Sequence, residues 1–111
     1  MTAQLDFTEL RKITGGDEMM ESELFQVFLD SAQECLSILR ETYGQGAENT
    51  WRGQAHAFKG ISLAVGAVEL GTLCKKAQEN HLAPPEEKKK MLAAIEKELA
   101  EVEHLVKKEM H

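Results

Sequence analysis

The chain has 111 residues, of which 42% are hydrophobic and 29% are charged, a balance that favours one globular domain over residues 1–111 and excludes a disordered chain. Its net charge of −6 argues against nucleic-acid binding, which needs a basic surface. No apolar run approaches the ~18 residues of a membrane span, and the N-terminus lacks the apolar segment of a signal peptide.

The first two elements are a short helix and a long one. Residues 6–13 are amphipathic, and the glycines at 15 and 16 end that helix, so we expect Phe7, Leu10 and Ile13 to cover one end of a core. Asp17 can cap the second helix, which should run for about 25 residues until Gly44. Its apolar residues recur at steps of three and four, the pattern of a helix in a bundle: Phe25, Leu29, Ala32, Leu36, Leu39 and Tyr43. Phe28 and Cys35 widen this apolar stripe.

Three further helices follow. One is expected over residues 47–64 and the next over 67–80, with Gly66 making the short turn between them. Pro85 suits the first position of the last helix, which should reach almost to the C-terminus. The lysines at 88–90 are expected to form a solvated face balanced by glutamates at 86, 87, 96 and 98. The expected inward residues of these last two helices are Leu70, Leu73, Cys74, Ala77, Leu92, Ile95, Leu99, Val102 and Val106.

Four long amphipathic helices and one short helix, without a convincing strand, define the expected fold class. It is all-α: an antiparallel up-down four-helix bundle with a short additional N-terminal helix. Each apolar stripe can be covered within one bundle, so we expect a monomer. Cys35 and Cys74 lack C-x-x-C spacing and should be buried thiols in a reducing compartment, which favours a cytoplasmic protein.

The helix over residues 47–64 carries the most informative residues. Lys59, Gly60 and Leu63 fall within roughly 60° of His56 around the helix, whereas the large apolar residues and Ser62 lie on the opposite side. By itself, His56 could be an ordinary exposed histidine. Gly60 costs about 1 kcal/mol inside a helix, so it should permit a close approach, either by another molecule near His56 or by a neighbouring helix.

No enzyme motif is evident. The sequence has no phosphate-binding loop, no dinucleotide-binding turn and no Ser/His/Asp arrangement. Glu101 and His104 form one E-x-x-H pair, but a di-iron bundle needs two such pairs and two more glutamates. We therefore expect no intrinsic cofactor, no metal and no ATP site.

The string His56-x-Phe58-Lys59-Gly60, followed by Gly66-Ala67, Leu70 and Cys74, resembles the signature of histidine-containing phosphotransfer (HPt) domains of multistep phosphorelays. The resemblance implies a phosphocarrier protein and not an enzyme. His56 would accept a phosphoryl group from the phosphoaspartate of a response-regulator receiver domain and pass it to another receiver. Lys59 would balance the phosphate charge, the receiver would supply Mg²⁺, and a sensor histidine kinase of the hybrid type would stand upstream.

The resemblance extends to other positions. Gln78 lies where HPt domains often place a residue that orients the imidazole by a hydrogen bond. Gly60 would keep the docking surface open, and Leu63 would belong to an exposed apolar docking patch together with residues of the second helix. Phe58 and Ala77 depart from the residues usual in the family, in ways that affect packing only.

Two alternatives stay open at this point. One is a bundle that binds receivers without chemistry, and the other is an acceptor domain phosphorylated directly by the ATP-binding domain of a histidine kinase. The sequence does not distinguish a free-standing protein from a domain of a larger kinase.

Overall fold

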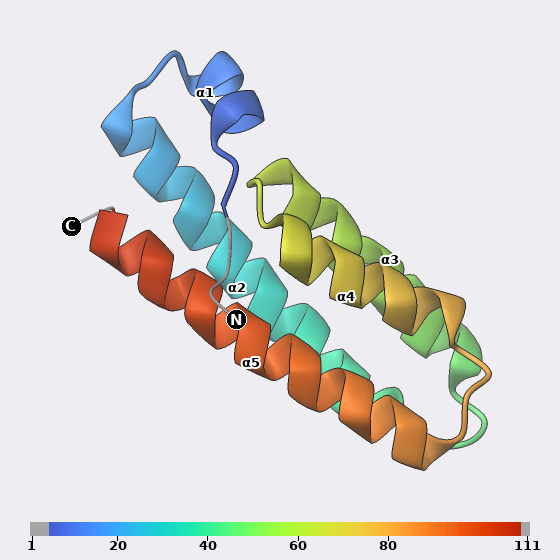
Figure 1. The fold of residues 1–111 in the computed structure, drawn as a ribbon. Helices are drawn as coiled ribbons and strands as arrows, with labels where there is room; N and C mark the ends of the chain where they lie inside the picture. The colour runs from blue at the N-terminus through green and yellow to red at the C-terminus, as the bar shows by residue number, and fades with distance from the viewer. Residues whose placement is uncertain (1–4, 110–111) are drawn as a thin grey trace.

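The structure is a computed structural model that describes residues 5–109, which form five helices (Figure 1). These helices are α1 (Thr8–Thr14), α2 (Glu18–Thr42), α3 (Glu48–Ala64), α4 (Val68–Glu79) and α5 (Pro85–Glu109). Within residues 5–109 there is no strand, only an isolated bridge between Leu5 and Ala67. The prediction of an all-helical chain is confirmed. No helix in the described part of the chain is long and apolar enough to cross a membrane.

Helices α2 to α5 contact one another in a closed ring. The α3–α4 contact is the most extensive, and α2 with α3, α4 with α5 and α2 with α5 complete the ring. In Figure 1 successive helices reverse direction, and α1 lies at the end of the assembly where α2 begins. The predicted apolar stripes of α2, α4 and α5 face the interior, where Tyr43 and Leu73 are half-buried at its edge.

The helix ends follow the chemistry of their residues. The Asp17 side chain accepts a hydrogen bond from the backbone N–H of Met20, which caps α2 as predicted. Gly15 takes the left-handed conformation that ends α1. Helix α1 begins at Thr8, later than predicted, because Asp6 belongs to another contact: its backbone N–H donates to the carbonyl of Gly66 at 2.8 Å.

The turn between α3 and α4 is crowded. Gly66 has a φ of +79°, as predicted for this turn, and a Cβ added there would collide with the backbone of Asp6. Glycine is therefore required twice over at this position, once for the backbone conformation and once for the close approach of residues 5–6. These residues fasten the start of the chain to the far end of the α3–α4 hairpin.

Helix α1 covers the core through one side only. Leu10 is buried, and the ring of Phe7 meets that of Phe25 edge-on at 5.6 Å. Ile13, however, is 73% exposed, so its predicted place in the core is wrong. The reason is that the packed side of this short helix carries Leu10 and Thr14, and Ile13 lies beyond its edge.

The prediction of a solvated face for the lysines at 88–90 is wrong for Lys88. This side chain is 1% exposed, and its ammonium group lies 5.1 Å from the centre of the Trp51 ring. Lys89 and Lys90 are exposed as predicted. Lys88 therefore joins the start of α5 to the start of α3.

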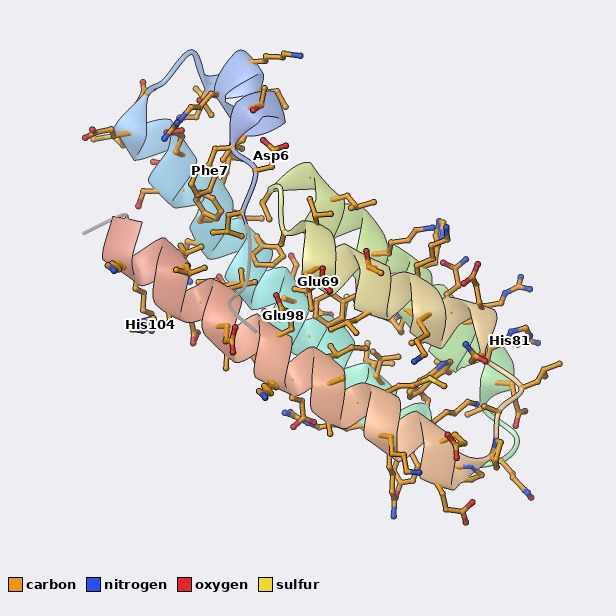
Figure 2. All side chains as sticks on the ribbon, in the orientation of Figure 1. Asp6, Phe7, Glu69, His81, Glu98 and His104 are labelled. Atoms are coloured by element: carbon orange, nitrogen blue, oxygen red, sulfur yellow. The ribbon has the colours of Figure 1, made fainter. Side chains whose placement is uncertain are left out.

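Glu98 is also buried, contrary to the prediction of a solvated position. Its Oε2 atom has no hydrogen-bond partner among the described residues. Burial raises the pKa of the Glu98 carboxyl above its usual value, and the charges of Glu101 and Glu69 raise it further. Figure 2 shows Glu69 and Glu98 between α4 and α5, so carboxyl groups of two helices approach one another inside this interface.

The two cysteines are buried and free, as the sequence predicts. Burial raises the pKa of the Cys74 thiol to about 12, and burial likewise raises that of Cys35. Since the thiolate is the reactive form, both are inert core residues.

Candidate functional site

His56 stands on the exposed side of α3, opposite the fully buried Trp51 and Phe58. The indole N–H of Trp51 donates to the carbonyl of Ala77 at 2.8 Å, which fixes α3 against α4. The hydroxyl of Ser62 donates to the carbonyl of Phe58 at 2.7 Å, so Ser62 faces inward as predicted. The apolar side of α3 is thus firmly held, and His56 is presented outward from it.

A depression of about 470 Å³ lies in front of His56. Both α3 and the end of α4 contribute to it, so the structure brings His56 together with Gln78 as the sequence analysis expected. Its lining residues are Arg52, Gly53, His56, Gln78, Glu79 and His81. The sequence analysis did not single out Arg52, Gly53 and His81, although helical spacing alone puts the first two beside His56.

The amide oxygen of Gln78 is buried and has no hydrogen-bond partner among the described residues. The expected hydrogen bond from Gln78 to the imidazole is therefore not formed through this oxygen. Gln78 lies close to His56, but its amide oxygen makes no hydrogen bond to the ring. His81 Nδ1 is a second buried polar atom without a partner at the same depression.

Gly60 and Gly53 leave the helix backbone bare on both sides of His56. A Cβ added at either position would meet nothing within 4 Å. A neighbouring helix therefore does not need Gly60, which removes that explanation for a helix-weakening glycine. Close approach of another molecule is the explanation that remains.

Lys59 and Leu63 occupy the next turn of α3. Lys59 is half-buried, and Leu63 is 49% exposed. A Cβ on Gly71 would come within 2.7 Å of the Leu63 side chain, so Leu63 lies across the α3–α4 contact. The exposure of Leu63 agrees with the expected apolar patch.

Helix α2 also carries an exposed apolar residue, Val27. Helix α2 ends at Thr42, and α3 begins at Glu48. Val27 precedes Thr42 by as many residues as Leu63 follows Glu48. The two side chains are therefore level along the α2–α3 pair. Val27 is 62% exposed, and Met19 and Met20 on the same helix are 73% and 44% exposed. Which residues of the second helix join Leu63 in a docking patch therefore stays a prediction.

Cations gather at the site although the chain as a whole is acidic. Arg52 precedes His56 by one helical turn and Lys59 follows it by nearly one turn, on a protein whose net charge is −6. Such a pair suits an anion bound at His56. Within residues 5–109, no three His, Cys, Asp or Glu side chains are arranged to hold a metal ion.

Comparison with known proteins identifies the family. The family model described as "Hpt domain" matches residues 23–105. The chain belongs to the Hpt family. The match runs from α2 into α5, so it includes the whole α3–α4 hairpin and leaves α1 outside. The resemblance recognised in the sequence is confirmed, and with it a role in phosphotransfer within phosphorelays.

A solved structure supports the same assignment. The crystal structure of histidine-containing phosphotransfer protein B (HptB) from Pseudomonas aeruginosa PAO1 is similar over 96% of this chain and 93% of that one, with 30% sequence identity and a TM-score of 0.83. No curated protein sequence matches the chain significantly. The structural similarity, unlike the family match, includes nearly the whole chain.

Proposed function

We propose that His56 is the phosphoacceptor of this Hpt domain, taking a phosphoryl group from the phosphoaspartate of one receiver domain and passing it to another. The observation that carries the proposal is the surface around His56: an exposed imidazole, bare backbone at Gly53 and Gly60 on either side, and two cations on the same helix. An antiparallel up-down four-helix bundle would present this surface on a rigid support.

The chemistry needs little from the carrier. A neutral imidazole nitrogen attacks phosphorus, the N–P bond forms as the aspartyl P–O bond breaks, and the electron pair leaves with the aspartate carboxylate. The second transfer reverses these events on another receiver. Lys59 offsets the charge of the phosphoryl oxygens, and the receiver supplies Mg²⁺. The Hpt domain acts as a phosphocarrier that needs no ATP site or metal of its own.

The surroundings of His56 provide the docking surface. Gly60 lets the receiver approach the backbone, and Leu63 supplies exposed apolar contact area. Gln78 orients the imidazole once its side-chain amide is turned. The partners are receiver domains and a hybrid sensor histidine kinase in the cytoplasm, and the domain meets them as a monomer.

Intact-mass analysis tests the assignment. Wild type, His56→Gln and His104→Gln, which changes an exposed histidine on α5, are incubated with phosphoramidate and separately with a receiver phosphorylated by acetyl phosphate. We expect one acid-labile phosphate on wild type and on His104→Gln, and none on His56→Gln, with the same helical circular dichroism in all three. Labelling of His56→Gln equal to wild type would overturn the proposal.

Two further reactions separate the alternatives. Label that arrives only from a histidine kinase with ATP, and never from a receiver, would indicate a direct kinase substrate. A receiver complex that forms without any transfer would indicate a binding scaffold. Transfer from the phosphorylated receiver is the result we expect.

A further inference from the structure

Two buried polar atoms without partners lie at the edge of the His56 depression. One is Oε1 of Gln78 and the other is Nδ1 of His81. Buried polar atoms in folded proteins are nearly always hydrogen-bonded, so two orphans at one site call for an explanation. Figure 2 shows His81 where the chain leaves α4 and turns toward α5.

The backbone puts these two side chains on the same side of the chain. They are three residues apart, and residues at this spacing are neighbours along a helical turn. The helical course continues past the end of α4, because the N–H of Asn80 donates to the carbonyl of Lys76 and the N–H of Ala83 to that of Asn80. Both side chains line the depression that also contains His56.

The chemistry of the two groups suggests how they meet. A glutamine amide carries an acceptor oxygen and a donor nitrogen of nearly the same shape, and a half-turn exchanges them. With the amide turned, its NH₂ group occupies the buried position, where it can donate to His81 Nδ1. Its oxygen then moves to the open side of the amide, toward the depression and His56.

We propose that His81 is a positioning residue for His56: its neutral Nδ1 accepts a hydrogen bond from the Gln78 amide, which directs the Gln78 oxygen toward His56 Nδ1–H. This inference rests on the proposed function and deepens it. With the proton held on Nδ1, the lone pair of His56 is on Nε2, the nitrogen that then attacks phosphorus. His81 touches no reacting atom and acts through Gln78 alone.

The arrangement makes phosphoryl acceptance sensitive to the charge of His81. A protonated His81 has no acceptor nitrogen and repels the amide NH₂ group. The Gln78 oxygen then turns back to His81 and offers its NH₂ group to His56, which favours the wrong tautomer.

Charged groups of other elements lie near His81. Glu48, at the start of α3, has a lowered pKa, mainly because the N–H of Gly46 donates to its carboxylate at 2.9 Å, with smaller effects from the charges of Lys88 and His81. Lys88 comes from α5. The other members of the depression that carry or can gain charge are Arg52, His56 and Glu79.

The test measures the tautomer of His56 by ¹⁵N NMR at pH 8, without phosphate. Wild type, His81→Phe, His81→Asn and the matched control His104→Phe are compared. In wild type we expect His56 to carry its proton on Nδ1. Phenylalanine cannot accept a hydrogen bond, so His81→Phe should shift the tautomer ratio by about three- to tenfold, the factor that one hydrogen bond supports. Asparagine offers an acceptor oxygen, so His81→Asn should keep the wild-type ratio, as should His104→Phe.

A tautomer ratio unchanged in His81→Phe, or a wild-type His56 with its proton on Nε2, would overturn the inference. If His81→Phe does not fold, the wild-type protein is studied by NMR over a range of pH. The resonances of the Gln78 side-chain amide should then change together with those of His81. Amide resonances that do not change with those of His81 would contradict the inference. Because the NMR measurement needs no phosphoryl transfer, its failure is distinct from failure of the His56 assignment.

The rate of phosphorylation by phosphoramidate supplies the functional readout. Wild type should lose reactivity more steeply on acidification than His81→Asn, whose acceptor does not titrate. Identical pH profiles of the two proteins would contradict a role for the charge of His81. A purely structural effect of the substitution would change the rate equally at every pH.

Discussion

Lys88 shows how one residue can mislead a pattern-based prediction. Three lysines in a row suggest solvent, yet the first has its stem buried and its ammonium group over the Trp51 ring. Sequence alone could not show this, because the ring comes from α3 and meets α5 only in the folded chain. Aliphatic lysine stems cover apolar surface readily, so a charged residue at the inner edge of a helix can belong to the core.

Replacing Lys88 with alanine should therefore destabilise the fold by about 2 kcal/mol, as expected for loss of a buried stem and its ring contact. Lys88→Met, which keeps the stem, should recover more than half of that loss. Urea unfolding followed by Trp51 fluorescence measures both. Lys90→Ala, an exposed change on the same helix, is the control and should cost less than about 0.5 kcal/mol. Equal effects of Lys88→Ala and Lys90→Ala would contradict the buried role.

Lys59 is predicted to act on the phosphoryl group and not on docking. Lys59→Ala should slow transfer from a phosphorylated receiver about tenfold, the size expected for one charge-assisted hydrogen bond. Affinity for the unphosphorylated receiver should change less than about threefold, because the exposed rim charges of an interface contribute little to affinity. Rapid-quench kinetics and fluorescence titration separate the two quantities. Lys76→Ala, an exposed change on α4, is the control, and transfer as fast as in that control would remove the role of Lys59.

At the scale of the elements, two glycines in turns allow a comparison of how much each contributes to stability. Gly66 and Gly16 both have positive φ, but only Gly66 has another part of the chain against it. Gly16→Ala should cost about 1 kcal/mol for the backbone conformation alone. Gly66→Ala should cost distinctly more, about 2–4 kcal/mol, because Asp6 must also move. Thermal or urea unfolding of both variants gives the comparison, and equal losses would show that the contact with residues 5–6 adds nothing.

The existence of each helix was predictable, and some ends were not. Apolar spacing indicates helices because burial of one face dominates their stability, and Asp17, Gly15 and Pro85 mark ends by local chemistry. The start of α1 depends instead on a contact between residues 6 and 66. Contacts between distant parts of the chain leave no local pattern that a sequence reading can use.

The candidate site divides in the same way. His56, Lys59 and Gly60 share one helix, so the sequence places them together. Gln78 came only from the family resemblance, and the structure brings it to the same depression. His81 carried no signal, since its relation to His56 arises from the packing of α3 on α4. The spacing of residues in the sequence predicts which side chains lie together on one helix. It does not predict which side chains of two helices meet at a shared site.

At the scale of the whole molecule, Glu98 couples stability to pH. Its folded-state pKa is raised, so its contribution to stability is fully present below the ordinary pKa of a glutamate and is lost as pH rises through the folded value. Glu98→Gln, which cannot ionise, should therefore be more stable than wild type at pH 7 by about 1 kcal/mol. The difference should shrink toward zero near pH 4.

Urea unfolding at the two pH values measures this difference. Glu96→Gln is the matched control two residues away: Glu96 pairs with Arg40 at 3.1 Å, so its loss should slightly destabilise the protein at pH 7. A Glu98→Gln protein no more stable than wild type at pH 7 would show that the buried carboxyl carries no penalty.

The contact of residues 5–6 with the turn at Gly66 has a consequence for the order of events during synthesis. A ribosome releases the N-terminal segment first, but the turn on which it docks is made only after α2 and α3 have emerged. Residues 5–6 therefore cannot make this contact until the α3–α4 turn has formed. We expect the docking of residues 5–6 to be a late step, so that the site on α3 is assembled before this contact forms.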